Sequence, residues 1–208
     1  KVSDKIFKYF FRFGVFFLVS APLYSSIILL ISAINGVFTK KEGFLKDKWN
    51  LFILITSFFM ISSGIINYFD NPIGENIWDP NLNFLGFFNW LPLFFCFWGF
   101  QKFLNTKEER ELIAKLLIAG SIPVIFSGFG QYFFNFNGPF TTMDKTITWF
   151  MRPIQDGAGM TGLFNNQNYA SAWLSMCLPF SVATFIKLKD KSKKILILLI
   201  TFLFLFAI

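Results

Sequence analysis

The chain has 208 residues, of which 54% are hydrophobic and 15% are charged, and phenylalanine alone contributes 33. An ordinary soluble domain has roughly 25% charged residues, so this composition excludes a water-soluble globule and indicates a membrane protein. The net charge is +7, but the basic residues lie in short clusters between apolar stretches, which is typical of membrane topology and not of nucleic-acid binding.

The first hydrophobic region, residues 6–38, is too long for one crossing. As a single helix it would extend about 50 Å, whereas the hydrocarbon core of a bilayer is about 30 Å thick. Ser20, Ala21 and Pro22 predict a turn between two short helices, because proline disfavours helix at the residue before it. The alternatives are one long tilted helix and an interfacial helix followed by a span.

Four later stretches are long, apolar and free of charge, and each predicts a membrane-spanning helix. They are residues 51–69, 84–101, 116–134 and 169–186, and a further apolar run covers 195–208. Because the chain starts at a lysine and stops inside this last run, we expect it to be the N-terminal part of a longer protein. The sequence predicts an all-α fold, a polytopic transmembrane helical bundle of about six to seven hydrophobic helices that forms a single domain over residues 1–208.

Basic residues cluster in every second connection between the predicted spans. The clusters are Lys40, Lys41, Lys46 and Lys48; Lys102, Lys107, Arg110 and Lys115; and Lys187, Lys189, Lys191, Lys193 and Lys194. The connections 70–83 and 135–168 are depleted in basic residues. By the positive-inside rule we expect the clusters to face the cytoplasm and these two connections to face outward.

The N-terminal basic residues fit this orientation only if residues 6–38 cross the membrane twice. They are Lys1, Lys5, Lys8 and Arg12. With two crossings they lie on the cytoplasmic side, and the alternation continues along the whole chain. The sequence therefore predicts a multi-pass protein of the bacterial inner (plasma) membrane.

Residues that bind metals or activate nucleophiles are scarce. Cys96 and Cys177 each lie inside a hydrophobic run without CxxC spacing, so we expect them to serve as apolar packing residues. The chain has no histidine, and it has no GxxxxGK[ST] nucleotide loop, DxD-like carboxylate pair or metal-ligand cluster. The sequence predicts no metal site, no cofactor and no nucleic-acid partner, and it names no catalytic residue.

The outward-facing loop 135–168 groups its polar residues directly before an apolar helix. Asn165 and Asn168 belong to an asparagine cluster at the predicted helix start, where side chains cap free backbone N–H groups and the helix dipole is positive. Arg152 lies upstream, so the segment could hold a phosphate or diphosphate. Alternatively, the asparagines only cap the helix, and Arg152 pairs with Asp156 or with lipid headgroups.

The same segment resembles a known family. The run from Thr161 to Ala170 looks like the G-x-F-x-N-x-N-x-x-A signature of the O-antigen ligase and O-antigen polymerase superfamily. The resemblance includes Gly162, Phe164, Asn165 or Asn166, Asn168 and Ala170, with Gln167 where many members carry proline. The chain also resembles related cyanobacterial membrane proteins once described as bicarbonate transporters. The close resemblance covers about twenty residues.

The resemblance implies a membrane glycosyltransferase that transfers or polymerises glycan linked to undecaprenyl diphosphate at the periplasmic face. Its partners would be this lipid-linked glycan and the lipid bilayer, and Arg152, Gly162, Asn165 and Asn168 would contribute to substrate binding. Two alternatives remain, a transporter of a small solute and a non-catalytic assembly partner. The predicted spans carry almost no ionisable residues, which disfavours a proton-coupled or ion-coupled transporter.

Overall fold

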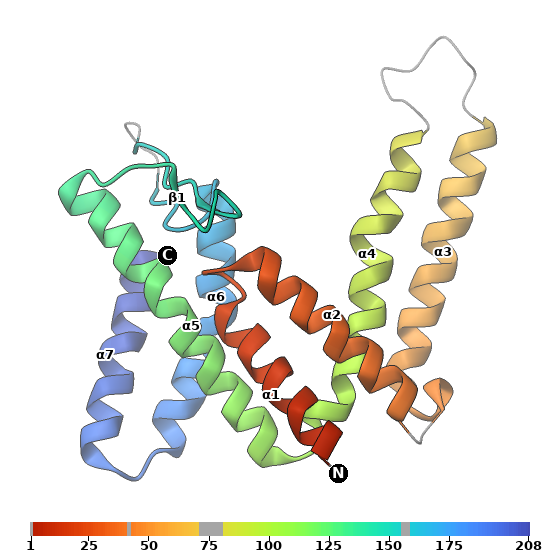
Figure 1. The fold of residues 1–208 in the computed structure, drawn as a ribbon, viewed down its shortest axis with the longest axis horizontal. Coiled ribbons are helices and arrows are strands. Elements are labelled where there is room, and N and C mark those ends of the chain that lie inside the picture. Colours follow the sequence, from red (N-terminus) through yellow and green to blue (C-terminus); the bar gives the residue numbers. More distant parts are fainter. Residues whose placement is uncertain (1, 41–42, 71–80, 155–158) are drawn as a thin grey trace. The chain divides into compact units, whose positions relative to one another are not determined.

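The computed structural model describes residues 2–40, 43–70, 81–154 and 159–208. The chain is mostly helical, at 78%, and its described part forms seven α-helices and one two-stranded sheet (Figure 1). The helices are α1 Val2–Phe17, α2 Pro22–Thr39, α3 Lys48–Asp70, α4 Asn81–Phe100, α5 Lys107–Phe134, α6 Gln167–Lys187 and α7 Lys191–Ala207; the strands are β1 Phe140–Thr142 and β2 Ile147–Trp149.

The chain forms two compact units. The first unit contains residues 1–29 and 104–208, and the second contains residues 30–103. Helix α2 therefore begins in the first unit and ends in the second. The single transmembrane domain predicted over residues 1–208 stays a prediction, and the two units are described separately below.

Four of the described helices, α2, α3, α5 and α6, are long and apolar enough to cross a membrane. This confirms the membrane-helix part of the predicted fold, whereas the predicted total of six to seven hydrophobic helices and the span predicted over 84–101 stay predictions. Helices α1 and α7 have 16 and 17 residues, which corresponds to about 25 Å, and a hydrocarbon core is about 30 Å thick.

Large apolar side chains cover the surface of the apolar helices. Phe58 and Phe59 of α3 are 64% and 65% exposed within the chain. Exposure to water would be unfavourable by about 1.5–3 kcal/mol for each such side chain relative to burial, and lipid removes this penalty. The surface therefore fits a lipid environment and not an aqueous one.

The predicted break in the first hydrophobic region is confirmed. Helix α1 ends at Phe17 and α2 begins at Pro22, with Ser20 and Ala21 in the turn between them. Proline at the first helical position lacks the N–H that a helix start leaves unpaired, so α2 can begin there without losing a hydrogen bond. The alternative of one long helix over residues 6–38 is wrong.

Helix α5 is the central helix of the first unit and packs against α1, α6 and α7. Thr106 caps its first turn by accepting a hydrogen bond from the backbone N–H of Glu109 at 3.2 Å. Val124 and Ile125 of α5, Leu174 of α6 and Phe204 of α7 are almost completely buried together. This apolar core fixes the three helices side by side.

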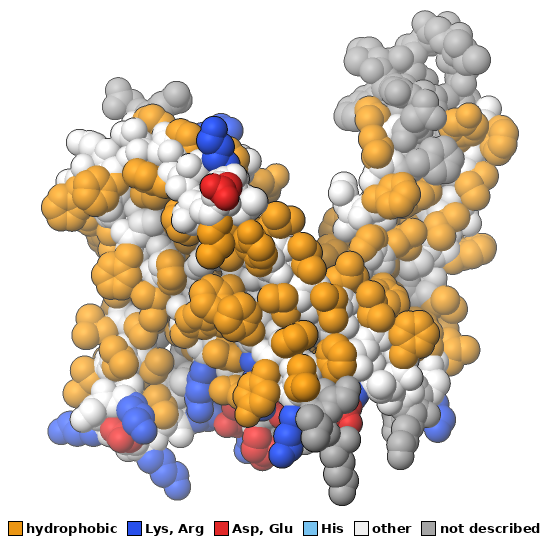
Figure 2. All heavy atoms as spheres, in the orientation of Figure 1, with side chains coloured by type: hydrophobic (Ala, Val, Ile, Leu, Met, Phe, Trp, Pro, Cys, Tyr) orange, Lys and Arg blue, Asp and Glu red, His pale blue; other side chains and the backbone are white. Residues whose placement is uncertain are grey.

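Two ion-pair groups lie at the end of the first unit where α5 begins. The Glu109 carboxylate lies 3.0 Å from Lys8 Nζ and 2.9 Å from Arg12 Nη2, both on α1. The Glu111 carboxylate lies 2.8 Å from Lys187 Nζ, at the end of α6. Figure 2 shows charged side chains gathered at this end of the helices, so one end carries the basic residues that the positive-inside rule assigns to the cytoplasm.

In the second unit, polar side chains join the lysine-bearing helix ends. Lys40 Nζ donates to Gln101 Oε1 at 2.6 Å, and Gln101 Nε2 donates to Asn50 Oδ1 at 2.8 Å. Asn50 is fully buried and donates to the Phe44 carbonyl at 2.7 Å. The segment 71–80, which includes most of the predicted outward connection 70–83, lies outside the described residues.

Close contact between α2 and α4 depends on small residues. A Cβ atom added to Gly36 would overlap the carbonyl oxygen of Gly99, and one added to Gly99 would overlap the carbonyl oxygen of Ala33. The two backbones therefore touch directly, as small residues permit in membrane helices.

We expect Gly99→Val to destabilise the second unit, since the larger side chain must separate α2 from α4. The expected loss is about 1–3 kcal/mol of unfolding free energy, measured by thermal unfolding of the purified protein in detergent. Gly86→Val is the matched control, because Gly86 is on the same helix and a Cβ added there meets nothing within 4 Å. Equal destabilisation by both variants would contradict the close contact.

Candidate functional site

The connection between α5 and α6 contains a small β-hairpin that the sequence analysis missed. Strands β1 and β2 are antiparallel, and Thr141 pairs with Thr148. Met143, Asp144 and Lys145 form the turn with φ between 49° and 69°. Gly138 donates its backbone N–H to the Met151 carbonyl at 2.9 Å and closes the base of the hairpin.

The hairpin is attached to the turn between α1 and α2. Trp149 donates its indole N–H to the Ser20 carbonyl at 2.8 Å, and the hydroxyl groups of Tyr24 and Thr146 lie 2.8 Å apart. The Trp149 bond satisfies a backbone acceptor in the turn between α1 and α2. The connection is therefore held against the first unit at two points.

Gln131 anchors the second half of the connection to α5. Its side chain is 2% exposed, and its Oε1 accepts from the backbone N–H groups of Thr161 and Gly162 at 2.9 and 3.1 Å. Its Nε2 donates to Thr161 Oγ1 at 3.0 Å and to the Arg152 carbonyl. One amide group thus binds two separate segments of the connection, at Arg152 and at Thr161 with Gly162.

Gly162 occupies a site where a larger residue would not fit. Its φ is +52°, and an added Cβ would lie 2.9 Å from the Val124 carbonyl oxygen of α5. A side chain would be strained by both the backbone conformation and the space. Gly162 is buried, so packing accounts for glycine at this position without a ligand, and its predicted part in substrate binding stays a prediction.

Arg152 combines a fixed backbone with a free side chain. Its N–H donates to Thr161 Oγ1 at 3.2 Å, and its carbonyl accepts from Gln131. The residue is exposed, and its guanidinium makes no hydrogen bond or ion pair with any residue that the structure describes. Asp156, the alternative partner suggested by the sequence, lies outside the described residues.

The asparagine cluster divides into one capping residue and two exposed ones. Asn166 is the N-cap of α6, with its Oδ1 accepting from the backbone N–H of Asn168 at 2.7 Å, so the predicted capping is confirmed. The side chains of Asn165 and Asn168 are exposed. Gln167 accepts a hydrogen bond from the Gly159 N–H, which ties the start of α6 back to the connection.

The structure brings the predicted site residues together to different degrees. Arg152 and Gly162 both bind the Gln131 amide, so they lie close to one another. Asn165 and Asn168 lie at the start of α6, and within the described ranges no hydrogen bond links their side chains to Arg152. Among the described residues the Arg152 guanidinium has no partner, and the exposed amides of Asn165 and Asn168 lie at a capped helix N-terminus. Both kinds of group are suited to binding an anion.

Gln131 and Thr161 are the organising residues that sequence reasoning missed. The sequence did contain an indication of the role of Gln131, since this residue is an amide within the apolar stretch 116–134. A polar side chain at membrane depth usually has a specific partner. Its partner could not be identified from the sequence, because Thr161 lies thirty positions away. Across the described part of the chain, no group of three or more metal-ligating residues is found.

Comparison with protein-family models, curated proteins and solved structures finds no match to this chain.

We expect Gln131→Leu to release the connection from α5. The substitution keeps the size of the side chain but leaves two buried N–H groups and one carbonyl without their partner, at roughly 1–3 kcal/mol each. Limited proteolysis of the protein in detergent should then cleave between residues 150 and 166 much faster. Asn137→Ala, an exposed amide in the same connection, is the control and should leave the cleavage rate unchanged; unchanged cleavage in Gln131→Leu would contradict the anchoring role.

Proposed function

We propose that the protein is a membrane glycosyltransferase of the O-antigen ligase and polymerase type. It transfers or polymerises glycan carried on undecaprenyl diphosphate at the periplasmic face of the bacterial inner membrane. The observation that supports this best is Arg152, whose guanidinium is exposed while its backbone is held by Gln131 and Thr161. It lies in the segment that resembles the signature of that superfamily.

A diphosphate is the part of such a donor that this site can recognise. Guanidinium forms paired hydrogen bonds with phosphate oxygens and stays charged at any physiological pH. A backbone anchored at both its N–H and its carbonyl fixes the point from which this side chain extends, so less backbone entropy is lost on binding. Asn165 and Asn168 add exposed amide donors at the start of α6, and no metal or cofactor enters this proposal.

The placement of charge supports a periplasmic site. Lys8, Arg12 and Lys187 form their ion pairs at the end of the first unit where α5 begins and α6 ends. The connection 135–168 joins the opposite ends of these two helices. If the basic end faces the cytoplasm, this connection faces outward.

We expect Arg152→Ala to reduce glycan transfer by about 10-fold to 100-fold. This range corresponds to the roughly 1.5–3 kcal/mol of a hydrogen bond to a charged group. The full-length protein is expressed in a strain that lacks its own ligase or polymerase, and lipid-linked glycan is examined by gel. Lys145→Ala is the matched control, because Lys145 is an exposed cation in the same connection, and it should retain activity.

The gel pattern also separates the alternative functions. Glycan moved to lipid A core indicates a ligase, and longer glycan on its carrier indicates a polymerase. Unchanged glycan with normal expression of the unmodified protein would overturn the proposal in favour of a solute transporter or an assembly partner. Full activity in Arg152→Ala would retain the enzyme class but reject the assigned residue.

We expect the orientation to be visible by cysteine labelling. In a variant whose Cys96 and Cys177 are replaced, Asn137→Cys should react with a membrane-impermeant maleimide added outside the inner membrane. Lys189→Cys should react only after that membrane is disrupted, because it lies in the connection at the basic end. The opposite pattern would place residues 135–168 in the cytoplasm and remove the proposed donor site.

A further inference from the structure

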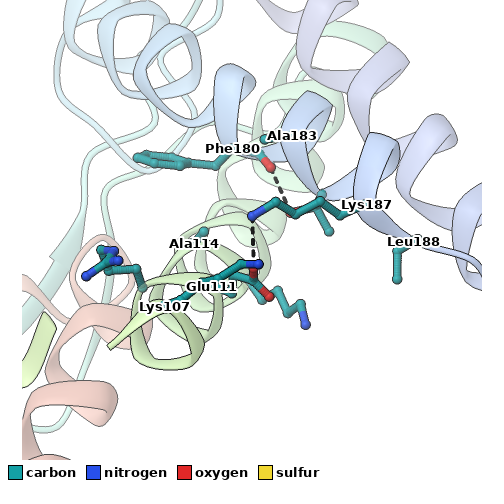
Figure 3. Close-up of a pocket in the computed structure, with 10 residues that line it drawn as sticks. Lys107, Glu111, Ala114, Phe180, Ala183, Lys187 and Leu188 are labelled. Carbon is teal, nitrogen blue, oxygen red and sulfur yellow. Dashed lines mark hydrogen bonds and ion pairs between the residues drawn. The ribbon is translucent and has the colours of Figure 1, made fainter. Parts of the chain in front are cut away.

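A cavity of about 410 Å³ lies between α5 and α6 at the end of the first unit opposite to the connection 135–168. Four basic residues line it: Lys107, Arg110 and Lys115 from α5 and Lys187 from α6. Glu111 is the one acidic residue in its lining. Figure 3 shows Lys187 and Glu111 pointing toward each other across the cavity, joined by their ion pair of 2.8 Å.

The cations exceed the single carboxylate by three. Glu111 neutralises Lys187, whereas Lys107 and Lys115 make no hydrogen bond or ion pair with the described residues. Arg110 is held in place because its Nη1 donates to the carbonyls of Leu104 and Asn105 at 2.8 and 3.1 Å. The cavity therefore has a preformed excess of positive charge that suits an anion.

The other part of the lining is apolar except for Thr184, whose hydroxyl donates to the Phe180 carbonyl at 2.7 Å. Ala114 of α5 and Phe180, Ala183 and Leu188 from α6 and its C-terminal end face the same cavity. Ala183 and Phe180 lie about one and two turns before Lys187, the last residue of α6 (Figure 3). Along α6 the lining is therefore basic at Lys187 and apolar at Ala183 and Phe180, further into the helix. A soluble anion would leave the apolar part unused, whereas a lipid would occupy both parts.

We propose that this cavity binds an anionic glycerophospholipid. The phosphate lies among Lys107, Lys115 and Arg110, and an acyl chain extends along Phe180 and Ala183. Basic pockets between membrane helices at the cytoplasmic side have the chemistry that recognises anionic headgroups. This site goes beyond the proposed glycosyltransferase function and does not depend on it, because it lies at the other end of α5 and α6.

The ion pair between Glu111 and Lys187 determines how tightly the site binds. In the empty cavity the carboxylate occupies the Lys187 ammonium and repels a phosphate. Removing this charge frees Lys187 and raises the positive excess by one. Glu111→Gln should therefore bind anionic lipid more tightly than the unmodified protein, an effect in the opposite direction to any loss caused by damage to the fold.

The test measures lipid binding to the purified full-length protein in detergent by native mass spectrometry. The probes are phosphatidylglycerol, phosphatidylcholine with the same acyl chains, and inorganic phosphate. We expect phosphatidylglycerol to bind, and a Lys107→Gln, Lys115→Gln double variant to bind it about 25-fold more weakly, since each lysine near an anionic lipid contributes roughly fivefold. Glu111→Gln should gain about fivefold.

Lys191→Ala is the matched control, because Lys191 is an exposed lysine at the same end of the first unit but does not line the cavity. It should bind phosphatidylglycerol as the unmodified protein does. Equal weakening in Lys191→Ala would show a diffuse charge effect and overturn the site. Equal binding of phosphatidylcholine, or binding of inorganic phosphate that displaces the lipid, would overturn the anionic lipid as its occupant, and so would unchanged binding in Glu111→Gln.

Discussion

The first unit depends on one buried amide. The segment around Thr161 returns against α5, where its backbone N–H and C=O groups are shielded from water and must find partners within the chain. Gln131 supplies both an acceptor and a donor. Its Oε1 accepts from the N–H groups of Thr161 and Gly162, and its Nε2 donates to the Arg152 carbonyl. A glutamine side chain has the same donor and acceptor as a peptide group, so here it replaces the neighbouring strand that such a segment would otherwise need.

This anchor explains the position of the rest of the connection 135–168. With Arg152 and Thr161 fixed, the hairpin before them can reach the turn between α1 and α2, where Trp149 binds the Ser20 carbonyl. The residues after them reach the start of α6, where Asn166 forms the cap. Three helices are therefore joined at this end by neutral hydrogen bonds, whereas ion pairs join them at the other end.

Sequence reasoning found the helices because each depends on local composition. The apolar stretches 51–69 and 169–186 became α3 Lys48–Asp70 and α6 Gln167–Lys187, extended by up to three residues at each end. Pro22 marked the start of α2 for a steric reason that requires no tertiary contact. Contacts between distant residues could not be predicted from local composition. Glu109 is the partner of Lys8 and Arg12, about one hundred positions away. The two strands were also missed, because a strand of three residues has too short a pattern to predict.

The asparagine cluster also shows that sequence reasoning finds a local feature without identifying the residue that forms it. The sequence indicated that an asparagine caps α6 but not which one, because the cap is chosen by backbone conformation. Asn166 has φ −146° and ψ 134° and can turn its side chain toward the Asn168 N–H. The side chains of Asn165 and Asn168 are left exposed. Because the resemblance admits either Asn165 or Asn166, the cap accounts for one of these two asparagines by helix stability, and our proposal assigns binding to the exposed ones.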